Sequence, residues 1–348
     1  MRGVNWVGDA VMTVPALREL RRLLPRARLT LATRAWAEGI FAGADFIDNF
    51  LVTGNTTSKP AAVFKEAREW RARRFDLAVL FPNAFAPALV AALARVPVRL
   101  GYATQGRSAL LTHSVVVPDW RGQRHEVFYY LHLVAELERQ LYGASTVETR
   151  APDTGLRVTD ARLLEAQLLL RESGVRPGRP LVAICPGSTN SRAKRWPAER
   201  FAAVADLLSE RAGAQVVLVG AVEELDISEE VARHMRVRPV LLTGTTDLAQ
   251  TTAVLKASDL LVTNDTGPAH IAAAVGCPVV VIFGPTNPFT TRPFSTSAEV
   301  VRRPPDCAPC MLRDCPIDHR CMTAVTAEEV FERAAHALGL RQKVEVAR

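Results

Sequence analysis

Short apolar runs alternate along the chain with stretches of helical periodicity. The candidate buried strands are Arg28–Thr33, Asp76–Phe81, Leu181–Cys185, Gln215–Gly220, Asp259–Thr263 and Pro278–Phe283. The candidate helices among them are Pro197–Gly213, Asp247–Ala257 and Pro268–Val275. Strands separated by helices predict parallel sheets with helices on both faces. Because the pattern occurs once before about residue 120 and again after about residue 180, we expect an α/β protein of two domains.

A segment of different amino-acid composition separates the two halves. Residues 150–159 are polar, and Asp160–Ser173 has leucines at helical spacing. Gly174–Pro180 then holds two glycines and two prolines, which is typical of a linker. We therefore expect domains at 1–174 and 175–348, with a last helix over Ala327–Leu338.

The composition suits a globular protein, since 48% of the 348 residues are hydrophobic and 23% are charged. No apolar run reaches the length of a transmembrane helix. Asp9 interrupts the apolar stretch at the N-terminus, which argues against a signal peptide. We expect a cytoplasmic protein, in which the six cysteines are free thiols by default and not a disulfide framework.

The net charge of +7 is unevenly distributed, because residues 1–175 carry +6 of it. This asymmetry predicts that the N-terminal half faces the more anionic partner, such as phosphates, a membrane surface or nucleic acid. A merely solubilising surface is the alternative.

The strongest candidate site is the loop that follows the apolar strand Asp259–Thr263. Gly267 permits a tight turn, and Pro268 suits the first position of the next helix. The start of a helix attracts a phosphate, and His270 in the first turn can donate to the same anion. An ordinary strand–turn–helix with a capping residue is the alternative. A second Gly–Pro loop at Phe283–Thr286 favours a binding site.

A second candidate loop, rich in hydroxyl and amide groups, runs from Cys185 to Pro197. Its hydroxyls and backbone N–H groups can hold phosphate oxygens, while Lys194 supplies a point charge. The loop has neither the Walker A nor the dinucleotide glycine pattern. A polar interdomain loop without a ligand is the alternative.

Gly8–Asp9 introduces a further helix, and Asp9 can be interpreted in two ways. The carboxylate could complement the helix dipole, or it could act as a general base in a cleft.

Four cysteines lie close together at Cys307, Cys310, Cys315 and Cys321. Four thiols at this density could form a tetrahedral structural zinc site, with His319 as a substitute ligand. The spacing is not that of a standard zinc finger, so a disulfide pair or reduced thiols are the alternatives.

Several cationic and aromatic residues could contact an anionic acceptor. The first group is Arg99, Tyr102 and Arg107, after a strand-like Val96–Val98. Lys59, Arg192 and Arg195 add positive charge. Each of them could instead be an ordinary surface charge.

These motifs resemble glycosyltransferase family 9 from residue 3 to about 335. The matching elements are Gly8–Asp9, Pro186–Gly187 with Lys194–Pro197, Asn264–Pro268 with His270, Phe283–Pro285, and the Cys–Xaa–Xaa–Cys segment. The resemblance implies a GT-B architecture of two Rossmann-like domains that face each other across a cleft. The acceptor would bind the N-terminal domain and the nucleotide sugar the C-terminal one, with the final helix packed back on the N-terminal domain.

Within the family, the chain is most similar to enzymes that build the lipopolysaccharide inner core. This similarity implies inverting transfer of L-glycero-D-manno-heptose from ADP-heptose to the first heptose of the core, heptosyl-Kdo2-lipid A. No cofactor would be required for catalysis. The partner would be a phosphorylated lipid A-core acceptor and not nucleic acid. We expect a monomer that is peripheral at the cytoplasmic face of the inner membrane.

Mapped onto this chain, the resemblance makes Asp9 the general base and Lys194 the group that neutralises the departing ADP. The implied donor-binding residues are Ser188, Thr189, Glu223, Asp265, Thr266, Gly267 and His270. Glu224 is the alternative to Glu223 as the partner of a ribose hydroxyl.

One departure from the family concerns the N-terminus. Family members have a short apolar strand before the Gly–Asp loop, whereas only Met1 and Arg2 precede Gly3 here. A missing central strand would leave its neighbours unpaired. We therefore expect the true start to lie upstream of Met1.

Other readings of the sequence are possible. Another core glycosyltransferase of the same family and a sugar-nucleotide epimerase share the fold. A nucleic-acid-binding zinc ribbon is disfavoured because aromatic residues are only 6% of the chain and the charge does not cluster around the cysteines. An inactive homologue is disfavoured because Asp9 and Lys194 are present.

Overall fold

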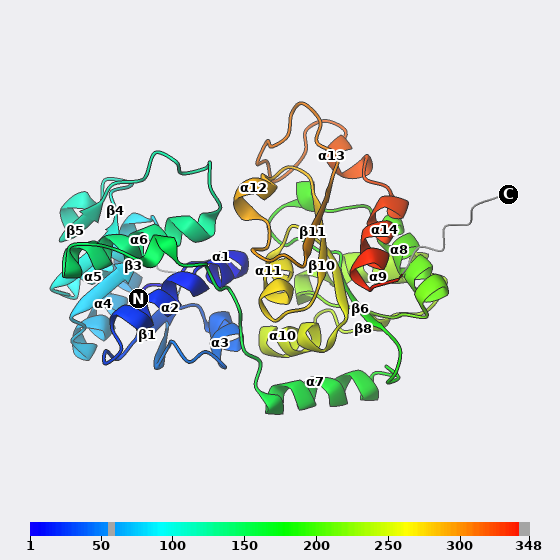
Figure 1. The fold of residues 1–348 in the computed structure, drawn as a ribbon, viewed down its shortest axis with the longest axis horizontal. Helices are drawn as coiled ribbons and strands as arrows, with labels where there is room; N and C mark the ends of the chain where they lie inside the picture. Colours follow the sequence, from blue (N-terminus) through cyan, green and yellow to red (C-terminus); the bar gives the residue numbers. More distant parts are fainter. Residues whose placement is uncertain (55–59, 341–348) are drawn as a thin grey trace. The chain divides into compact units, whose positions relative to one another are not determined.

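The computed structural model describes residues 1–54 and 60–340, which form two compact units (Figure 1). Unit 1 is Met1–Thr154 and unit 2 is Gly155–Arg348. Each unit is a parallel sheet with helices, so the expected α/β class with two Rossmann-like domains is confirmed. Lys59, a candidate cation in the sequence, lies outside the described residues.

The sheet of unit 1 is parallel and is completed by the first residues of the chain. Its strands are β1 (Thr30–Thr33), β2 (Asn49–Val52), β3 (Leu77–Leu80), β4 (Val98–Tyr102) and β5 (His113–Val115). β1 pairs with β2, and β3, β4 and β5 form a second group. Arg2 makes bridges to Ala32 of β1 and to Leu80 of β3, and so it joins the two groups.

Helices surround this sheet and bury its apolar side chains. They are α1 (Val7–Met12), α2 (Val14–Leu23), α3 (Ala35–Phe41), α4 (Pro60–Arg73), α5 (Phe85–Leu93), α6 (Glu126–Tyr142) and the 3₁₀ turns η1 (Ser108–Leu110) and η2 (Val147–Thr149). One core cluster contains Leu80 of β3, Trp70 of α4 and Val90 of α5. The sequence analysis did not foresee β2, β5 or helices α3 to α6.

The sheet of unit 2 has six parallel strands in the order β11-β10-β9-β6-β7-β8. The strands are β6 (Leu181–Cys185), β7 (Gln215–Leu218), β8 (Val240–Leu241), β9 (Leu260–Asn264), β10 (Val279–Phe283) and β11 (Ala298–Arg302). This is the doubly wound order. After β6, the chain adds β7 and β8 on one side of it and then returns to add β9, β10 and β11 on the other side. That reversal falls between β6 and β9, which are hydrogen-bonded neighbours. Ligands of such sheets bind at the carboxyl ends of the strands at this point.

The helices of unit 2 largely agree with the predicted ones. They are α7 (Asp160–Glu172), α8 (Ala198–Ala212), α9 (Leu225–His234), α10 (Leu248–Ala257), α11 (Gly267–Ala274), α12 (Pro288–Thr291), α13 (Arg320–Thr323), α14 (Ala327–Ala337) and the turns η3 (Arg192–Lys194) and η4 (Val222–Glu224). The expected strands and helices of this half match the observed ones to within one or two residues at most ends.

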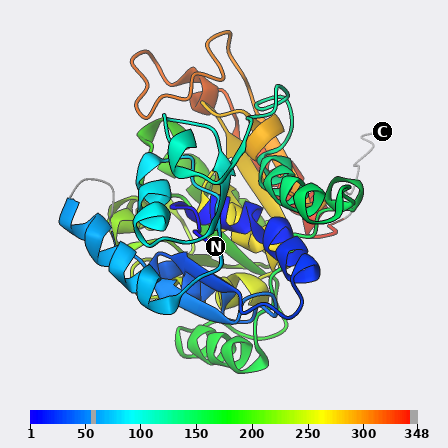
Figure 2. The same ribbon diagram turned by 90° about the vertical axis from the view of Figure 1, so that its left-hand side faces the viewer.

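The division into units differs from the expected domain boundary. The units divide after Thr154, whereas the sequence analysis placed the boundary at 174. Helix α7 packs against α10 and so belongs to unit 2 (Figures 1 and 2). The final helix α14 buries Val330 and Ala334 in the core of unit 2 with residues of α8. Its apolar face therefore packs within its own unit. The expectation that the helix also packs back on the N-terminal domain stays a prediction.

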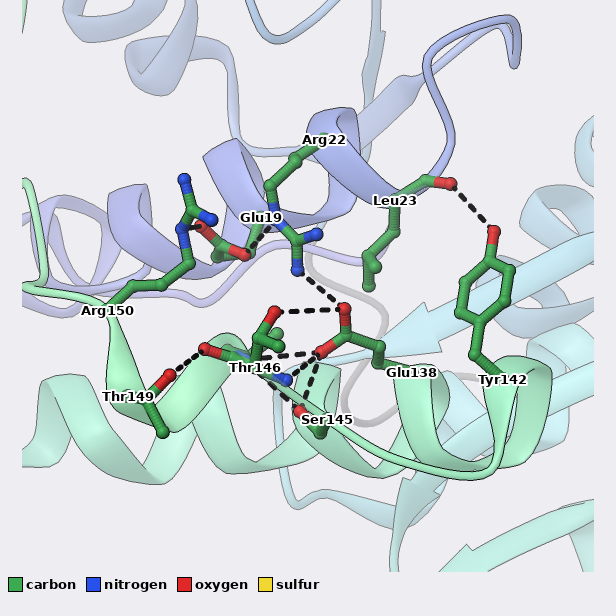
Figure 3. Close-up of polar contacts among 10 residues, drawn as sticks. Glu19, Arg22, Leu23, Glu138, Tyr142, Ser145, Thr146, Thr149 and Arg150 are labelled. Atoms are coloured by element: carbon green, nitrogen blue, oxygen red, sulfur yellow. Dashed lines mark hydrogen bonds and ion pairs between the residues drawn. The ribbon is translucent and has the colours of Figure 1, made fainter.

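A polar network joins α2, α6 and the segment after α6 within unit 1 (Figure 3). Glu138 on α6 is 5% exposed. Its carboxylate accepts hydrogen bonds from Arg22 Nη2 at 2.8 Å, Ser145 Oγ at 2.7 Å and the backbone N of Thr146 at 2.7 Å.

In residues 1–54 and 60–340, no helix combines the length and apolar character that crossing a bilayer requires.

Candidate active site

The carboxyl ends of β6 and β9 are tied together by side chains of β9. Thr263 Oγ1 donates to the carbonyl oxygen of Cys185 at 3.0 Å. Asn264 Nδ2 donates to the carbonyl oxygen of Pro186 at 2.7 Å, and its Oδ1 accepts from the backbone N of Trp196 at 3.0 Å. Asn264 thereby fixes both ends of the loop that carries Lys194.

Lys194 and Asp265 form an ion pair at this point of the sheet. Lys194 Nζ lies 2.8 Å from Asp265 Oδ2 and donates to the Asp265 carbonyl oxygen at 3.1 Å. Thr286 Oγ1 donates to the same carboxylate oxygen at 2.6 Å. The Lys194 side chain is 26% exposed, whereas that of Asp265 is 6% exposed. The lysine can thus reach a ligand while the aspartate orients it. The sequence analysis missed Thr286, although its place just after the Gly284–Pro285 loop was a usable signal.

The start of α11 lies directly after Asp265. Thr266 is its N-cap residue, Gly267 and Pro268 open the helix, and its first turn has no acidic side chain. His270 is buried in that first turn. A helix start without a carboxylate is favourable for an anion.

The loop after β6 carries two donor-site candidates, Ser188 and Thr189, and contacts Glu224. Ser188 is buried, and Thr189 Oγ1 donates to Glu224 Oε1 at 3.1 Å. The other carboxylate oxygen of Glu224 accepts from the backbone N of Ala221 at 3.0 Å. Gly187 lies so close that a Cβ there would overlap the Glu224 carboxyl group. Glu223 is exposed, so of the two glutamates it is Glu224 that contacts this loop.

The cysteine-rich segment, residues 307–321, contacts the loop that carries Lys194. Both lie in unit 2. The backbone N of Ala193 donates to the carbonyl oxygen of Arg313 at 2.9 Å, and Ser191 Oγ donates to the same oxygen at 3.2 Å. His319 Nε2 lies 2.6 Å from the carbonyl oxygen of Ala193, which accepts a hydrogen bond from the imidazole. The segment therefore holds the turn that ends at Lys194.

The expectation of a zinc site at these cysteines is wrong. Within the described part of the chain, no three His, Cys, Asp or Glu side chains come together to hold a metal ion. Cys307 and Cys315 are exposed, Cys310 is partly exposed and Cys321 is buried, and all four are free thiols. The segment has a different role. It is attached to the loop after β6 by the hydrogen bond between His319 and Ala193, and not by a cluster of thiolates.

In unit 1, Asp9 lies in the first turn of α1, half-buried, with Trp6 at the N-cap position. Tyr130 of α6 lies close to it, since burial first, and then the carboxylates of Asp9 and Glu126, raise the pKa of this tyrosine well above its usual range. Burial also raises the pKa of Glu126. The geometry is compatible with a base and with a residue that complements the dipole of α1.

The three expected acceptor residues occupy structural positions in unit 1. Tyr102 is 1% exposed, and its hydroxyl donates to the carbonyl oxygen of Tyr129 at 2.7 Å. Arg107 is fully buried, and its guanidinium donates to the carbonyl oxygens of Tyr102 at 2.9 Å and Ala84 at 3.0 Å. Burial lowers the pKa of Arg107 to about 10.

Arg99 is likewise engaged with the backbone. Its Nε donates to the carbonyl oxygen of Leu110 at 2.7 Å, and its Nη1 donates to that of Val96 at 2.6 Å. The burial of Tyr102 and Arg107 leaves their side chains out of reach of an acceptor, and their polar groups hold β4 and the turn after it. The expected acceptor contact of Arg99, which is only partly buried, stays a prediction.

Two parallel α/β units, one of them doubly wound with a lysine–aspartate pair and an acid-free helix start at its switch point, are the arrangement of a GT-B glycosyltransferase. The sequence profile of glycosyltransferase family 9 (heptosyltransferase) matches residues 63–320. Because the match covers more than half of the chain, the chain belongs to this family.

Individual relatives are similar over most of their length. Lipopolysaccharide heptosyltransferase 2 of Salmonella typhimurium is 28% identical over 306 residues, 86% of each chain. The solved structure of Escherichia coli ADP-heptose lps heptosyltransferase II matches with a TM-score of 0.81 and 25% identity over 97% of each chain. A family 9 structure from Veillonella parvula matches with a TM-score of 0.83 at 23% identity, over 98% of this chain and 96% of its own.

Proposed function

We propose that this protein transfers L-glycero-D-manno-heptose from ADP-heptose to the first heptose of the lipopolysaccharide inner core. The observation that carries the proposal is the Lys194–Asp265 pair at the switch point of unit 2, where a diphosphate would be bound. Support for the sugar comes from relatives named lipopolysaccharide heptosyltransferase 2, which match 86% of the chain.

On the donor side, Lys194 would turn from Asp265 toward the diphosphate and neutralise the charge that develops as ADP leaves. Ser188 and Thr189 would contact the diphosphate with the start of α11, at Thr266 and Gly267. His270 would donate to the same group. Glu224, already held by Ala221 and Thr189, would accept a hydrogen bond from a ribose hydroxyl.

On the acceptor side, Asp9 would remove the proton of the attacking hydroxyl. An inverting transfer needs one carboxylate base and no covalent enzyme intermediate, because the hydroxyl attacks from the face opposite the leaving group. The proton then resides on Asp9 and the electron pair of the broken glycosidic bond on ADP.

Three finer features belong to the same proposal. The protein would act as a monomer, in the cytoplasm, peripherally at the inner membrane where a lipid A-core acceptor lies. Lys194 and the helix start would stabilise the leaving group without a required cofactor.

The test is a transfer assay with purified protein, ADP-heptose and heptosyl-Kdo2-lipid A. We expect release of one ADP per heptose added, with the heptosylated product identified by mass spectrometry. Kdo2-lipid A and an acceptor that already carries two heptoses are the comparison substrates. Transfer to either of these alone would instead indicate a family 9 enzyme of the heptosyltransferase I or III type. The absence of ADP release with all three would contradict the proposal.

A further inference from the structure

Two arginines just before α6 have the planes of their guanidinium groups covered by aromatic rings. Arg121 Cζ lies 4.2 Å from the ring centroid of Tyr129. Arg124 Cζ lies 4.2 Å from the centroid of Phe128 and 5.0 Å from that of Trp120. Both arginines are exposed. A ring occupies only the face of a guanidinium, so the N–H groups at its edge can still donate to an anion.

The rings beneath the arginines are themselves fixed. Tyr129 is 2% exposed, and its hydroxyl donates to Asn83 Oδ1 at 3.2 Å and accepts from Arg121 Nη1 at 3.3 Å. The edge of Trp120 contacts the ring of His132, with centroids 5.6 Å apart. The two guanidinium groups therefore pack on rings that are held in place, and the arginine side chains would lose little conformational entropy when they bind an anion.

Neither arginine forms a close ion pair among the described residues, although burial raises the pKa of Glu126 and the charge of Arg121 acts to lower that pKa. Elsewhere in unit 1, Arg22 and Arg139 lie 2.8 Å and 2.6 Å from the carboxylates of Glu138 and Glu148. Among the residues that the structure describes, Arg121 and Arg124 form no ion pair of this kind. Two fixed, unpaired guanidinium groups favour planar, bidentate binding of phosphate or carboxylate.

Arg121 lies in the same region of unit 1 as the candidate base. Tyr130 of α6 is influenced electrostatically by Asp9, Glu126 and Arg121. Helices α1 and α6 are in contact, so Asp9 and the start of α6 share one region of unit 1. An anion held at this position would be close to the group that the reaction requires.

We propose that Arg121 and Arg124 form a binding site for the phosphate or carboxylate groups of the acceptor, next to Asp9. The site rests on the proposed function, because it takes its ligand from the acceptor. It supplies the cationic contacts that the buried Arg107 does not offer. The aromatic residues position the guanidinium groups, and the arginines contact the anion.

The first test measures transfer kinetics for Arg121→Ala, Arg124→Ala and Arg124→Lys. Loss of one charge-assisted contact should raise the KM for the acceptor about 10- to 100-fold, while the KM for ADP-heptose stays within about twofold. Arg124→Lys keeps the charge but loses the planar fork and should lie between wild type and Arg124→Ala. Arg71→Ala, which removes an exposed arginine of α4 without a ring partner, should change neither value. An unchanged KM for the acceptor in both alanine variants would overturn the proposal.

The second test does not depend on the reaction. Binding of free Kdo, a carboxylate probe, and of glucosamine 1-phosphate is followed by the fluorescence of Trp120, with Trp120→Phe as the signal control. We expect saturable binding of at least one probe by wild-type protein and at least tenfold weaker binding by the Arg121→Ala/Arg124→Ala double variant. The probe that binds identifies carboxylate or phosphate as the ligand group. Equal affinity of wild type and double variant for both probes, or no binding of either by wild type, would contradict the site even if heptose transfer is observed.

Discussion

Lys194 Nζ and Asp265 Oδ2 lie 2.8 Å apart, although their residues come from loops after different strands, β6 and β9. The pair exists because β6 and β9 are neighbours in the sheet and Asn264 fixes the Lys194 loop. Asp265 is also bonded to Thr286, from the loop after β10. Three strand ends therefore converge on one carboxylate, which leaves the lysine ammonium as the exposed member of the group.

Replacing Lys194 with alanine tests this arrangement. We expect kcat to fall about 100- to 1000-fold, since a cation directed at a leaving group acts mainly in the transition state. The measurement is the steady-state rate of ADP release at saturating donor. Arg238→Ala is the control, because Arg238 is an exposed cation of unit 2 outside the turn that carries Lys194. A kcat within threefold of wild type for Lys194→Ala would rule out the assigned role.

Asp9→Asn should separate chemistry from donor binding. Loss of a general base is expected to lower kcat about 100- to 10,000-fold. The affinity for ADP, measured by calorimetry, should be unchanged because the proposed donor site lies in unit 2. Asp45→Asn is the control, as Asp45 is an exposed carboxylate on the surface of unit 1 with an ion pair to Arg18 at 3.7 Å. Full activity of Asp9→Asn would favour the alternative in which this residue only complements the dipole of α1.

Much of the fold could be predicted from the sequence, because buried parallel strands are continuous apolar runs bounded by loops. β6, β9 and β10 are buried at every position, and each was expected. β4 was only partly foreseen, since its partly buried Val98–Arg99 pair resembles a surface segment. The domain boundary was misplaced because Gly174 and Pro177 suggest a linker, whereas packing of α7 on α10 places that helix in unit 2.

The candidate site could likewise be predicted from the sequence only in part. Residues after strand ends, such as Lys194 and Asp265, were found because a parallel sheet gathers these ends at one edge. Arg107 was assigned wrongly because a sequence does not reveal whether an arginine is buried with its donors used by backbone carbonyl groups. Arg121 and Arg124 were missed because the rings that hold them are recognisable only after α6 has formed.

Gly187→Ala tests the role of Glu224. The added Cβ would overlap the Glu224 carboxyl group and must displace it from Thr189 and Ala221. We expect a lower melting temperature and a KM for ADP-heptose raised about tenfold. In the double variant Gly187→Ala/Glu224→Ala the overlap disappears, so the melting temperature should recover while the KM stays high. Recovery of both values would show that Glu224 is not a donor ligand.

Glu138 on α6 predicts a specific dependence of stability on pH. Burial alone would raise the pKa of this carboxyl, but hydrogen bonds from Arg22, Ser145, Thr146 and Val147 outweigh it and lower the pKa to about 2. The unfolded chain has the ordinary value of 4.5. A depressed pKa stabilises the folded state above the unfolded value, so this contribution is complete above pH 4.5 and is lost as the pH falls toward 2.

Glu138→Gln should therefore lower the free energy of unfolding by about 2 to 3 kcal/mol at pH 7, measured by urea denaturation. The difference from wild type should shrink below pH 4.5, because wild-type Glu138 then loses its own advantage. Glu136→Gln on the same helix is the control: its side chain is 29% exposed and pairs with Arg139, so a change below about 1 kcal/mol is expected. A difference between Glu138→Gln and wild type that is independent of pH would show that packing, and not the carboxylate charge, accounts for the effect.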